Sequence, residues 1–412
     1  MSVLVEADRP SRPRTFAALA HRNYRLWFCG QLVSLVGTWM QTTALGFLMF
    51  ELTRSPVYLG YAGFAGGAPT IFLTLYGGVI SDRASRRTVL IWSQTAMMAL
   101  AFTLAALTFA GVVRPWHILV LAFGLGVANA FDAPARQALV SELVEREDLT
   151  NAIALNATMF NGATAVGPAA AGLTYQWWGP GWCFAANGLS FLAVIAALSA
   201  MRIVPRARAS RASAASDMLE GLRYVRHERM IRTLIATVGA TSLIVTSAVT
   251  LIPAWTVRIL HGTSSTNGLL VSARGIGAVV AALFVASLPR SASRGRLLTT
   301  GTFAIPVLLV AFAATTSLAG SLVLLVCLGG AVLLVNNLAN ALVQTQVPDG
   351  LRGRVMGVYT FVFFGAMPLG ALWIGATAQQ VGERIAIAVA AALALSSALT
   401  VAIREPRLRT LR

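Results

Sequence analysis

Apolar segments of about 20 residues follow one another from Leu26 to Ile403, separated by short polar breaks. A helix needs about 20 apolar residues to cross a hydrocarbon core of roughly 30 Å. Buried helices of a soluble core explain one or two such segments, but not a long series. The pattern therefore predicts an all-α membrane protein with twelve transmembrane helices, at residues 26–50, 57–80, 88–110, 118–138, 151–175, 182–201, 231–256, 267–288, 297–315, 321–346, 353–378 and 385–403.

The longest internal break, residues 202–230, divides these helices into two groups of six. Its second part carries apolar side chains at a spacing that fits one face of a helix lying on the membrane surface. We therefore expect five parts: a basic N-terminal segment (1–25), an N-terminal six-helix bundle (26–201), a central loop with an amphipathic helix (202–230), a C-terminal six-helix bundle (231–403) and a tail (404–412).

The two groups of helices also resemble each other locally. Gly167 in the fifth helix corresponds to Gly370 in the eleventh, and Gly172 corresponds to Gly375, with the same offset of 203 residues. Secondary transporters are built from paired halves of this kind, with the substrate path at the interface between them. The repeat therefore supports a transport function.

All 32 basic residues are arginine, against 15 acidic residues, which gives a net charge of +17. With the N-terminus in the cytoplasm, 27 arginines fall in cytoplasmic segments, four fall outside and one, Arg274, lies within a helix. This asymmetry is the positive-inside bias of a multi-pass protein of the cell (inner) membrane with both termini cytoplasmic. The charge thus records topology and predicts no nucleic-acid partner, whereas weak attraction to anionic lipids of the bilayer fits it.

The chain contains no lysine, which excludes ATP hydrolysis by a P-loop and Schiff-base chemistry. Its three cysteines show no CxxC spacing, and its four histidines lie at helix ends or in loops. We therefore expect no metal site, no cofactor and no enzymatic activity. Transport without ATP hydrolysis would depend on an ion gradient.

The segment between the second and third helices has the spacing G-x3-D-R-x-x-R-R, formed by Gly78, Asp82, Arg83, Arg86 and Arg87. It resembles motif A of the major facilitator superfamily, at its usual position and with Ser85 in place of the usual glycine. A loop following the positive-inside rule is the alternative explanation. Twelve helices with a central break favour the motif, which the resemblance places at the inner gate.

The fifth helix carries the segment GATAVGPAAAG, which contains Gly162, Gly167, Pro168 and Gly172. It resembles motif C, typical of antiporters in the same superfamily, where glycines and proline bend the helix and pack it against the eighth. Ordinary packing of small residues in membrane helices is the alternative. The resemblance to motif C implies export and not uptake.

Three longer segments, residues 131–158, 219–226 and 344–359, resemble the branch that includes the enterobactin exporter and macrolide efflux permeases. The resemblance implies the major facilitator fold and alternating access. It also implies export of a small amphipathic molecule, a siderophore or a drug-like compound, in exchange for protons. A facilitator or importer of a small nutrient on the same fold is the alternative. We expect the protein to act as a monomer.

Asp132 is the one carboxylate well inside a predicted helix, and an ionisable group in the membrane indicates a functional site. In the superfamily, motif A arginines pair with an acid near the inner end of the fourth helix. The resemblance therefore implies that Asp132 is a gating partner of Arg83 or Arg86. Two alternatives stay open: Asp132 carries protons, or it pairs locally with Arg136 one turn further along.

Polar side chains form stripes on the helices that the superfamily places around its central cavity. Arg274, the only cation within a helix, either binds an anionic substrate or reaches the outer interface. Polar groups in lipid must face protein or water, so hydrogen bonding between helices is the alternative for each one. We expect the substrate cavity to include Gln31, Ser34, Thr38, Gln41, Thr246, Arg274, Asn336 and Asn340. Such a cavity is polar but almost uncharged, which suits a bulky amphipathic solute.

Overall fold

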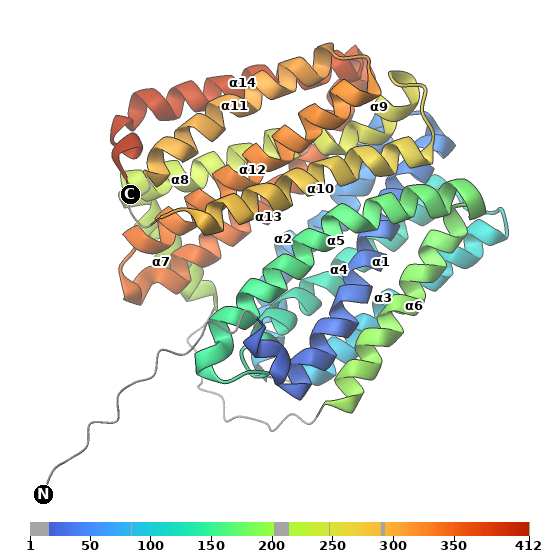
Figure 1. Cartoon of the computed structure of the whole chain (residues 1–412), viewed down its shortest axis with the longest axis horizontal. Coiled ribbons are helices and arrows are strands. Elements are labelled where there is room, and N and C mark those ends of the chain that lie inside the picture. The colour runs from blue at the N-terminus through green and yellow to red at the C-terminus, as the bar shows by residue number, and fades with distance from the viewer. Residues whose placement is uncertain (1–15, 84, 202–213, 247, 290–292, 412) are drawn as a thin grey trace, which may run out of the picture.

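The computed structural model describes residues 16–83, 85–201, 214–246, 248–289 and 293–411. These residues form helices joined by turns and irregular segments, and none of them forms a strand. Of residues 74–83, 214–216, 246 and 410 it describes the backbone only. The helices of the N-terminal group and those of the C-terminal group form two bundles lying next to each other (Figure 1).

The N-terminal bundle consists of α1 (Arg22–Thr53), α2 (Pro56–Arg83), α3 (Arg86–Phe109), α4 (Pro115–Val140), α5 (Leu149–Trp178) and α6 (Pro180–Ala200), with short turns η1 (Ala17–Ala20) and η2 (Arg146–Asp148). Helices α2, α4 and α6 begin with proline, whose fixed φ suits the first helical turn. Gly179 separates α5 from α6 with a φ of 89°, which glycine adopts without strain. The chain therefore passes from α5 to α6 through a single residue.

The C-terminal bundle contains a composite seventh span followed by α10 (Ser264–Ser287), α11 (Arg294–Ala314), α12 (Leu318–Gln346), α13 (Asp349–Val381) and α14 (Glu383–Arg404), and the chain then forms a short turn, η5 (Pro406–Thr410). Ten helical segments of the described chain are long and apolar enough to cross a membrane. The two other spans, α2 and α5, have 28 and 30 residues, which is also long enough. The prediction of twelve transmembrane helices in two bundles of six is confirmed.

The seventh span differs from the continuous helix predicted over 231–256. It consists of α8 (Arg229–Ala240), a π-helical turn η3 (Thr241–Thr246), a 3-10 turn η4 (Val249–Leu251) and α9 (Ile252–Arg258). Pro253 lies in the first turn of α9, and its ring lacks an N–H and clashes with the carbonyl four residues earlier. Pro253 therefore favours a break just before α9, although α2, α4, α5, α11 and α13 continue through prolines of their own.

The amphipathic helix predicted in the central loop is α7 (Ala214–His227). Val225 on one of its faces is buried, and a Cβ added to Gly221 would lie 2.5 Å from the Arg354 carbonyl oxygen of α13. Leu219 and Leu222 are exposed on another face. The helix thus packs on α13 through one face and leaves two leucines uncovered; residues 202–213 before it lie outside the described residues.

The internal repeat is visible where the two bundles meet. A Cβ added to Gly172 of α5 would lie 3.2 Å from the Cα of Gly268 in α10. A Cβ added to Gly375 of α13 would lie 3.0 Å from the Cα of Gly60 in α2. The fifth helix therefore meets the eighth in the same way as the eleventh meets the second, and both crossings depend on glycine.

We name the two ends of the molecule the basic end, where α1 begins at Arg22, and the distal end, where α1 ends at Thr53. In Figure 1 the distal end lies to the right, near α9. Contacts between the bundles run along residues 164–172 of α5 and 56–67 of α2, in the distal half of each helix. In this conformation the two bundles are closed together at the distal end.

Candidate functional site

The motif C residues of α5 lie between two neighbouring helices. A Cβ on Gly268 of α10 would lie 2.4 Å from the Pro168 carbonyl oxygen, and a Cβ on Gly167 would lie 2.6 Å from the Trp39 Cβ of α1. No described atom lies within 4 Å of a Cβ added to Gly162. The motif therefore allows close packing against α10 on one side and α1 on the other, and Gly162 takes no part in it.

Two motif A arginines bind the ends of other helices in the N-terminal bundle. Arg86 donates to the Ala138 carbonyl in the last turn of α4 at 3.0 Å and forms a 2.6 Å ion pair with Glu142. Arg87 donates to the Ser199 carbonyl in the last turn of α6 at 2.9 Å. Cations are favoured at helix C-termini because the carbonyls there carry partial negative charge. Both arginines thus hold α3 to its neighbours.

The other three motif A positions, Gly78, Asp82 and Arg83, lie near the end of α2, where the structure describes the backbone only. The same is true of Thr246, the last residue of η3 and a predicted cavity residue.

Asp132 of α4 is 1% exposed, and its carboxylate faces α3. Its Oδ1 accepts hydrogen bonds from Ser93 Oγ at 3.0 Å and Gln94 Nε2 at 2.9 Å, and its Oδ2 lies 3.6 Å from Arg136 Nε. The local pair with Arg136, one of the three interpretations left open by the sequence, is present in this conformation. Arg86, one of the two expected gating partners, binds Glu142 instead. The side chain of the other, Arg83, lies outside the described part of the structure, and gating and proton transfer stay predictions.

The polar stripe on α1 is divided between two environments. Gln31, Ser34 and Gln41 are at most 3% exposed, and Gln41 Oε1 accepts a 2.8 Å hydrogen bond from Asn187 Nδ2 of α6. Thr38 is exposed. In this conformation the three buried residues face the packed interior of the N-terminal bundle, and only Thr38 of the four is exposed; that all four line a cavity stays a prediction.

Predicted cavity residues of the C-terminal bundle lie on α12 and α10. Asn340 accepts a 2.6 Å hydrogen bond from Gln344, and the Tyr359 hydroxyl donates to the Asn336 carbonyl oxygen at 3.1 Å. The Nε of Arg274 is buried and has no hydrogen-bond partner among the described residues. Among the described residues, the amide of Asn340 is therefore hydrogen-bonded, whereas the side-chain oxygen of Asn336 and the Nε of Arg274 are buried without a partner.

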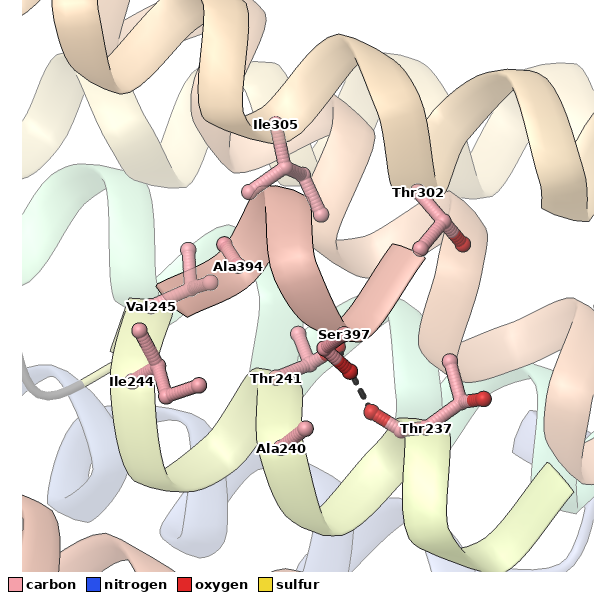
Figure 2. A pocket seen from close by; sticks show the side chains of 9 residues that line it. All are labelled: Thr237, Ala240, Thr241, Ile244, Val245, Thr302, Ile305, Ala394 and Ser397. Carbon is pink, nitrogen blue, oxygen red and sulfur yellow. Dashed lines mark hydrogen bonds between the residues drawn. The ribbon is translucent and has the colours of Figure 1, made fainter. Parts of the chain in front are cut away.

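Two cavities lie away from these residues. The gap in Figure 2, between α8, η3, α11 and α14, holds about 10 Å³, which is about one water molecule. There the Thr241 hydroxyl donates to the Thr237 carbonyl at 2.9 Å (Figure 2). A cavity of about 340 Å³ at the distal end lies where α1, α5 and α9 meet, and Tyr175 donates a hydrogen bond to Glu51 at its wall.

A set of contacts at the distal end was missed by sequence reasoning. Arg258, the last residue of α9, pairs with Glu383, the first residue of α14, and donates to the Arg54 carbonyl oxygen between α1 and α2. Its guanidinium carbon also lies 5.3 Å from the centre of the Phe50 ring. Arg258 therefore joins the two bundles. The only signal in the sequence is that it is one of four arginines outside the basic end.

A family described as transmembrane secretion effector matches residues 13–411 of the chain. The chain belongs to this family of the major facilitator superfamily. Family membership makes it a multi-pass membrane transporter and agrees with the resemblance carried by motifs A and C.

Several curated relatives are similar over much of their length. Multidrug efflux pump Tap of Mycolicibacterium fortuitum is 28% identical, covering 92% of this chain and 95% of the relative. Macrolide efflux protein A of Streptococcus pyogenes is 23% identical, with 87% and 90% covered. The staphyloferrin A transporter of Staphylococcus aureus is 23% identical, with 63% and 66% covered. The chain is thus similar to transporters named for different solutes.

Solved structures agree with the fold. The nucleoside transporter NupG superimposes with a TM-score of 0.72 at 13% identity, covering 93% of this chain and 98% of that one. A bacterial homologue of the human lysosomal transporter Spinster gives 0.72 at 12% identity, with 94% and 98% covered. At such identities the likeness concerns the fold, that of the major facilitator superfamily.

Proposed function

We propose that the protein exports a small amphipathic molecule, a siderophore or a drug-like compound, by alternating access and in exchange for protons. The observation that carries the proposal is the pair of equivalent crossings, α5 with α10 and α2 with α13, that close one end of the molecule. Small residues form these crossings, so the bundles can separate and meet again without moving large side chains.

The orientation is part of the proposal. The basic end is cytoplasmic, as the positive-inside rule requires, and the distal end faces outward. The moving parts are then residues 26–201 and 231–403, linked by the central loop of residues 202–230. With the distal end closed, the solute enters from the cytoplasm between the bundles. One chain contains both halves of this path, so a monomer suffices.

Export is the direction that the relatives favour, because two of those described above are named as efflux proteins. Motif C on α5 points the same way by resemblance. The exposed Thr38 of α1 and the amides Asn336 and Asn340 of α12 are assigned to the solute path. The buried Gln31, Ser34 and Gln41 are assigned to the packing behind it.

Proton exchange is assigned to the carboxylate of Asp132, with Arg136 as its partner. The carboxylate is buried on α4 and accepts hydrogen bonds from two side chains of α3. Protonation would weaken its attraction to Arg136 and free that cation. Motif A, including Gly78, Asp82 and Arg83, is assigned to the inner gate that this change opens or closes.

The test is transport in inside-out membrane vesicles with an imposed pH gradient, acid inside, across a macrolide, a tetracycline and a catecholate siderophore. We expect uptake of at least one of them into the vesicles, collapse of that uptake on adding a protonophore, and no uptake into vesicles without the protein. Uptake that is unchanged by the protonophore would contradict proton exchange but not export. Movement only out of the vesicles would contradict export and favour the importer alternative.

A further inference from the structure

Arg274 lies on the side of α10 that faces away from the bilayer. The exposed apolar side chains of this helix, Leu269, Ile276, Val280 and Leu283, recur at intervals of seven, four and three residues, which marks one helical face. At 3.6 residues per turn, Arg274 lies roughly 150° around the axis from that face. Its side chain therefore points between the bundles and not into lipid.

Arg274 is too far from either end of α10 for its charge to reach the membrane surface. It lies ten residues after Ser264 and thirteen before Ser287, or about 15 Å and 20 Å along the axis. Long side chains reach the interface from positions near helix ends. The snorkelling alternative is therefore inconsistent with the position of Arg274 in α10.

Among the described residues, no carboxylate is paired with Arg274. Asp132 is paired with Arg136 and Glu383 with Arg258. No ion pair or hydrogen bond connects the Arg274 guanidinium to another described residue, and its Nε is buried. Arg274 as a whole is half-buried, and a partly desolvated charge without a partner is costly, so an occupant that supplies the missing anion would be stabilised here.

Arg274 lies where the backbone of α10 packs on α12. Its carbonyl oxygen lies 2.1 Å from the Cβ position of Gly329, so the two helices touch through backbone at this level. Asn336 lies two turns further along α12, about 10 Å toward the basic end, and its side-chain oxygen is buried without a described partner. Arg274 and Asn336 thus both belong to the region where α10 and α12 pack together, roughly two helical turns apart.

We propose that Arg274 binds an oxyanion group, such as a carboxylate, of the exported solute. The guanidinium fork matches the two oxygens of a carboxylate, which a lysine or an amide cannot do equally well. This inference rests on the proposed export function and narrows it to solutes that carry an anionic group. The same chemistry is present in the phosphate of an anionic lipid, so the test separates the two sources.

The first experiment measures whether position 274 is accessible to water or covered by lipid, and it does not depend on transport. Arg274→Cys is made in a chain lacking Cys29, Cys183 and Cys327, reconstituted in liposomes and treated with a membrane-impermeant thiol reagent. Ile276→Cys on the lipid-facing side of the same helix is the matched control. We expect labelling of position 274 at least about tenfold faster than that of position 276. Equal rates would overturn the proposal.

The second experiment measures binding to the purified full chain in lipid nanodiscs, using 2,3-dihydroxybenzoate and its uncharged isostere 2,3-dihydroxybenzamide. We expect the acid to bind roughly tenfold more tightly than the amide, Arg274→Gln to abolish this preference and Arg274→Lys to retain part of it. The preference must persist in discs with and without phosphatidylglycerol. Loss of the preference in discs that contain phosphatidylglycerol would identify the lipid as the occupant and overturn the proposal. A wild-type protein that binds the acid and the amide equally well would also overturn it, even if export of a macrolide is observed.

Discussion

The guanidinium of Arg258 lies 2.8 Å from the carboxylate of Glu383 and, on its other side, donates to the carbonyl oxygen of Arg54. Glu383 is 5% exposed, whereas the side chain of Arg258 is 40% exposed. Arg258 and Glu383 belong to the C-terminal bundle, and Arg54 belongs to the N-terminal bundle. The hydrogen bond from Arg258 to Arg54 can therefore exist only while the distal end is closed, whereas the ion pair with Glu383 lies within the C-terminal bundle.

We expect Arg258→Gln to shift the protein toward opening at the distal end. A hydrogen bond to a charged group contributes about 1.5–3 kcal/mol, less when one partner is partly exposed, so the closed state should lose roughly tenfold in population. The measurement is the distance between spin labels at Val112 and Leu318, two exposed distal positions on opposite bundles.

Arg384→Gln is the matched control for Arg258, because it removes the same charge next to Glu383 from an exposed side chain without a described ion pair. Its distance distribution should equal that of the wild type. If both variants or neither of them lengthen the distance, the contact of Arg258 with Arg54 does not hold the distal end closed.

We expect Gly268→Val to prevent close approach of α10 to α5. The added Cβ would lie 2.4 Å from the Pro168 carbonyl oxygen and 2.9 Å from the Gly172 Cα, and overpacking of this kind costs about 1–3 kcal/mol. The melting temperature in detergent should fall by several degrees, and Gly60→Val, at the equivalent crossing, should have the same effect.

Gly162→Val is the control for the glycine variants, because no described atom lies within 4 Å of its Cβ position. It should melt within about a degree of the wild type, since surface substitutions change stability by about 0.5 kcal/mol or less. A Gly268→Val protein as stable as Gly162→Val would mean that the crossing is not closely packed in solution.

The positions of the twelve helices follow from hydropathy because a chain in lipid must satisfy its backbone hydrogen bonds within each segment. The partners of polar side chains do not follow in the same way. Periodicity placed Gln41 correctly on a polar face of α1, but its partner Asn187 lies 146 residues away in the chain. The periodicity of polar residues identifies one face of a helix. Whether water or another helix covers that face depends on how the bundle is assembled.

The same limit applies to the ion pairs. Arg258 and Glu383 are 125 residues apart, each among few charges at its end of the molecule, and no spacing rule connects them. Arg83 or Arg86 was expected to reach Asp132, and of these two Arg86 binds Glu142, just after the end of α4. The internal glycine repeat was more informative, because Gly172 and Gly375 mark equivalent crossings in the two bundles.

We expect Asp132→Asn to separate stability from coupling. Asparagine keeps an oxygen that can accept from Ser93 and Gln94, so melting should change little, whereas proton-driven transport should be lost with the carboxylate. Asp132→Ala should also lower stability, because each buried partner left without a hydrogen bond costs about 1–3 kcal/mol. Thermal melting and vesicle transport at several pH values measure both effects.

Glu142→Gln, which breaks the pair with Arg86 but leaves Asp132 intact, is the control for coupling. It should keep the pH dependence of transport even if the rate changes. If Asp132→Asn retained both the transport rate and its pH dependence, neither a coupling nor a gating role for this carboxylate would stand.

We expect Arg354→Gln to loosen α7 from the C-terminal bundle. Arg354 of α13 binds Asp217 at 2.9 Å and Glu220 at 2.6 Å, both on α7, and all three side chains are partly exposed. Single surface pairs contribute about 0–1 kcal/mol, so loss of both should raise hydrogen exchange of residues 214–227 by several-fold to roughly tenfold.

Arg352→Gln, whose pair is with the exposed Asp349, is the matched control and should leave the exchange of α7 unchanged. Equal exchange in the two variants would show that apolar packing alone holds α7 on α13.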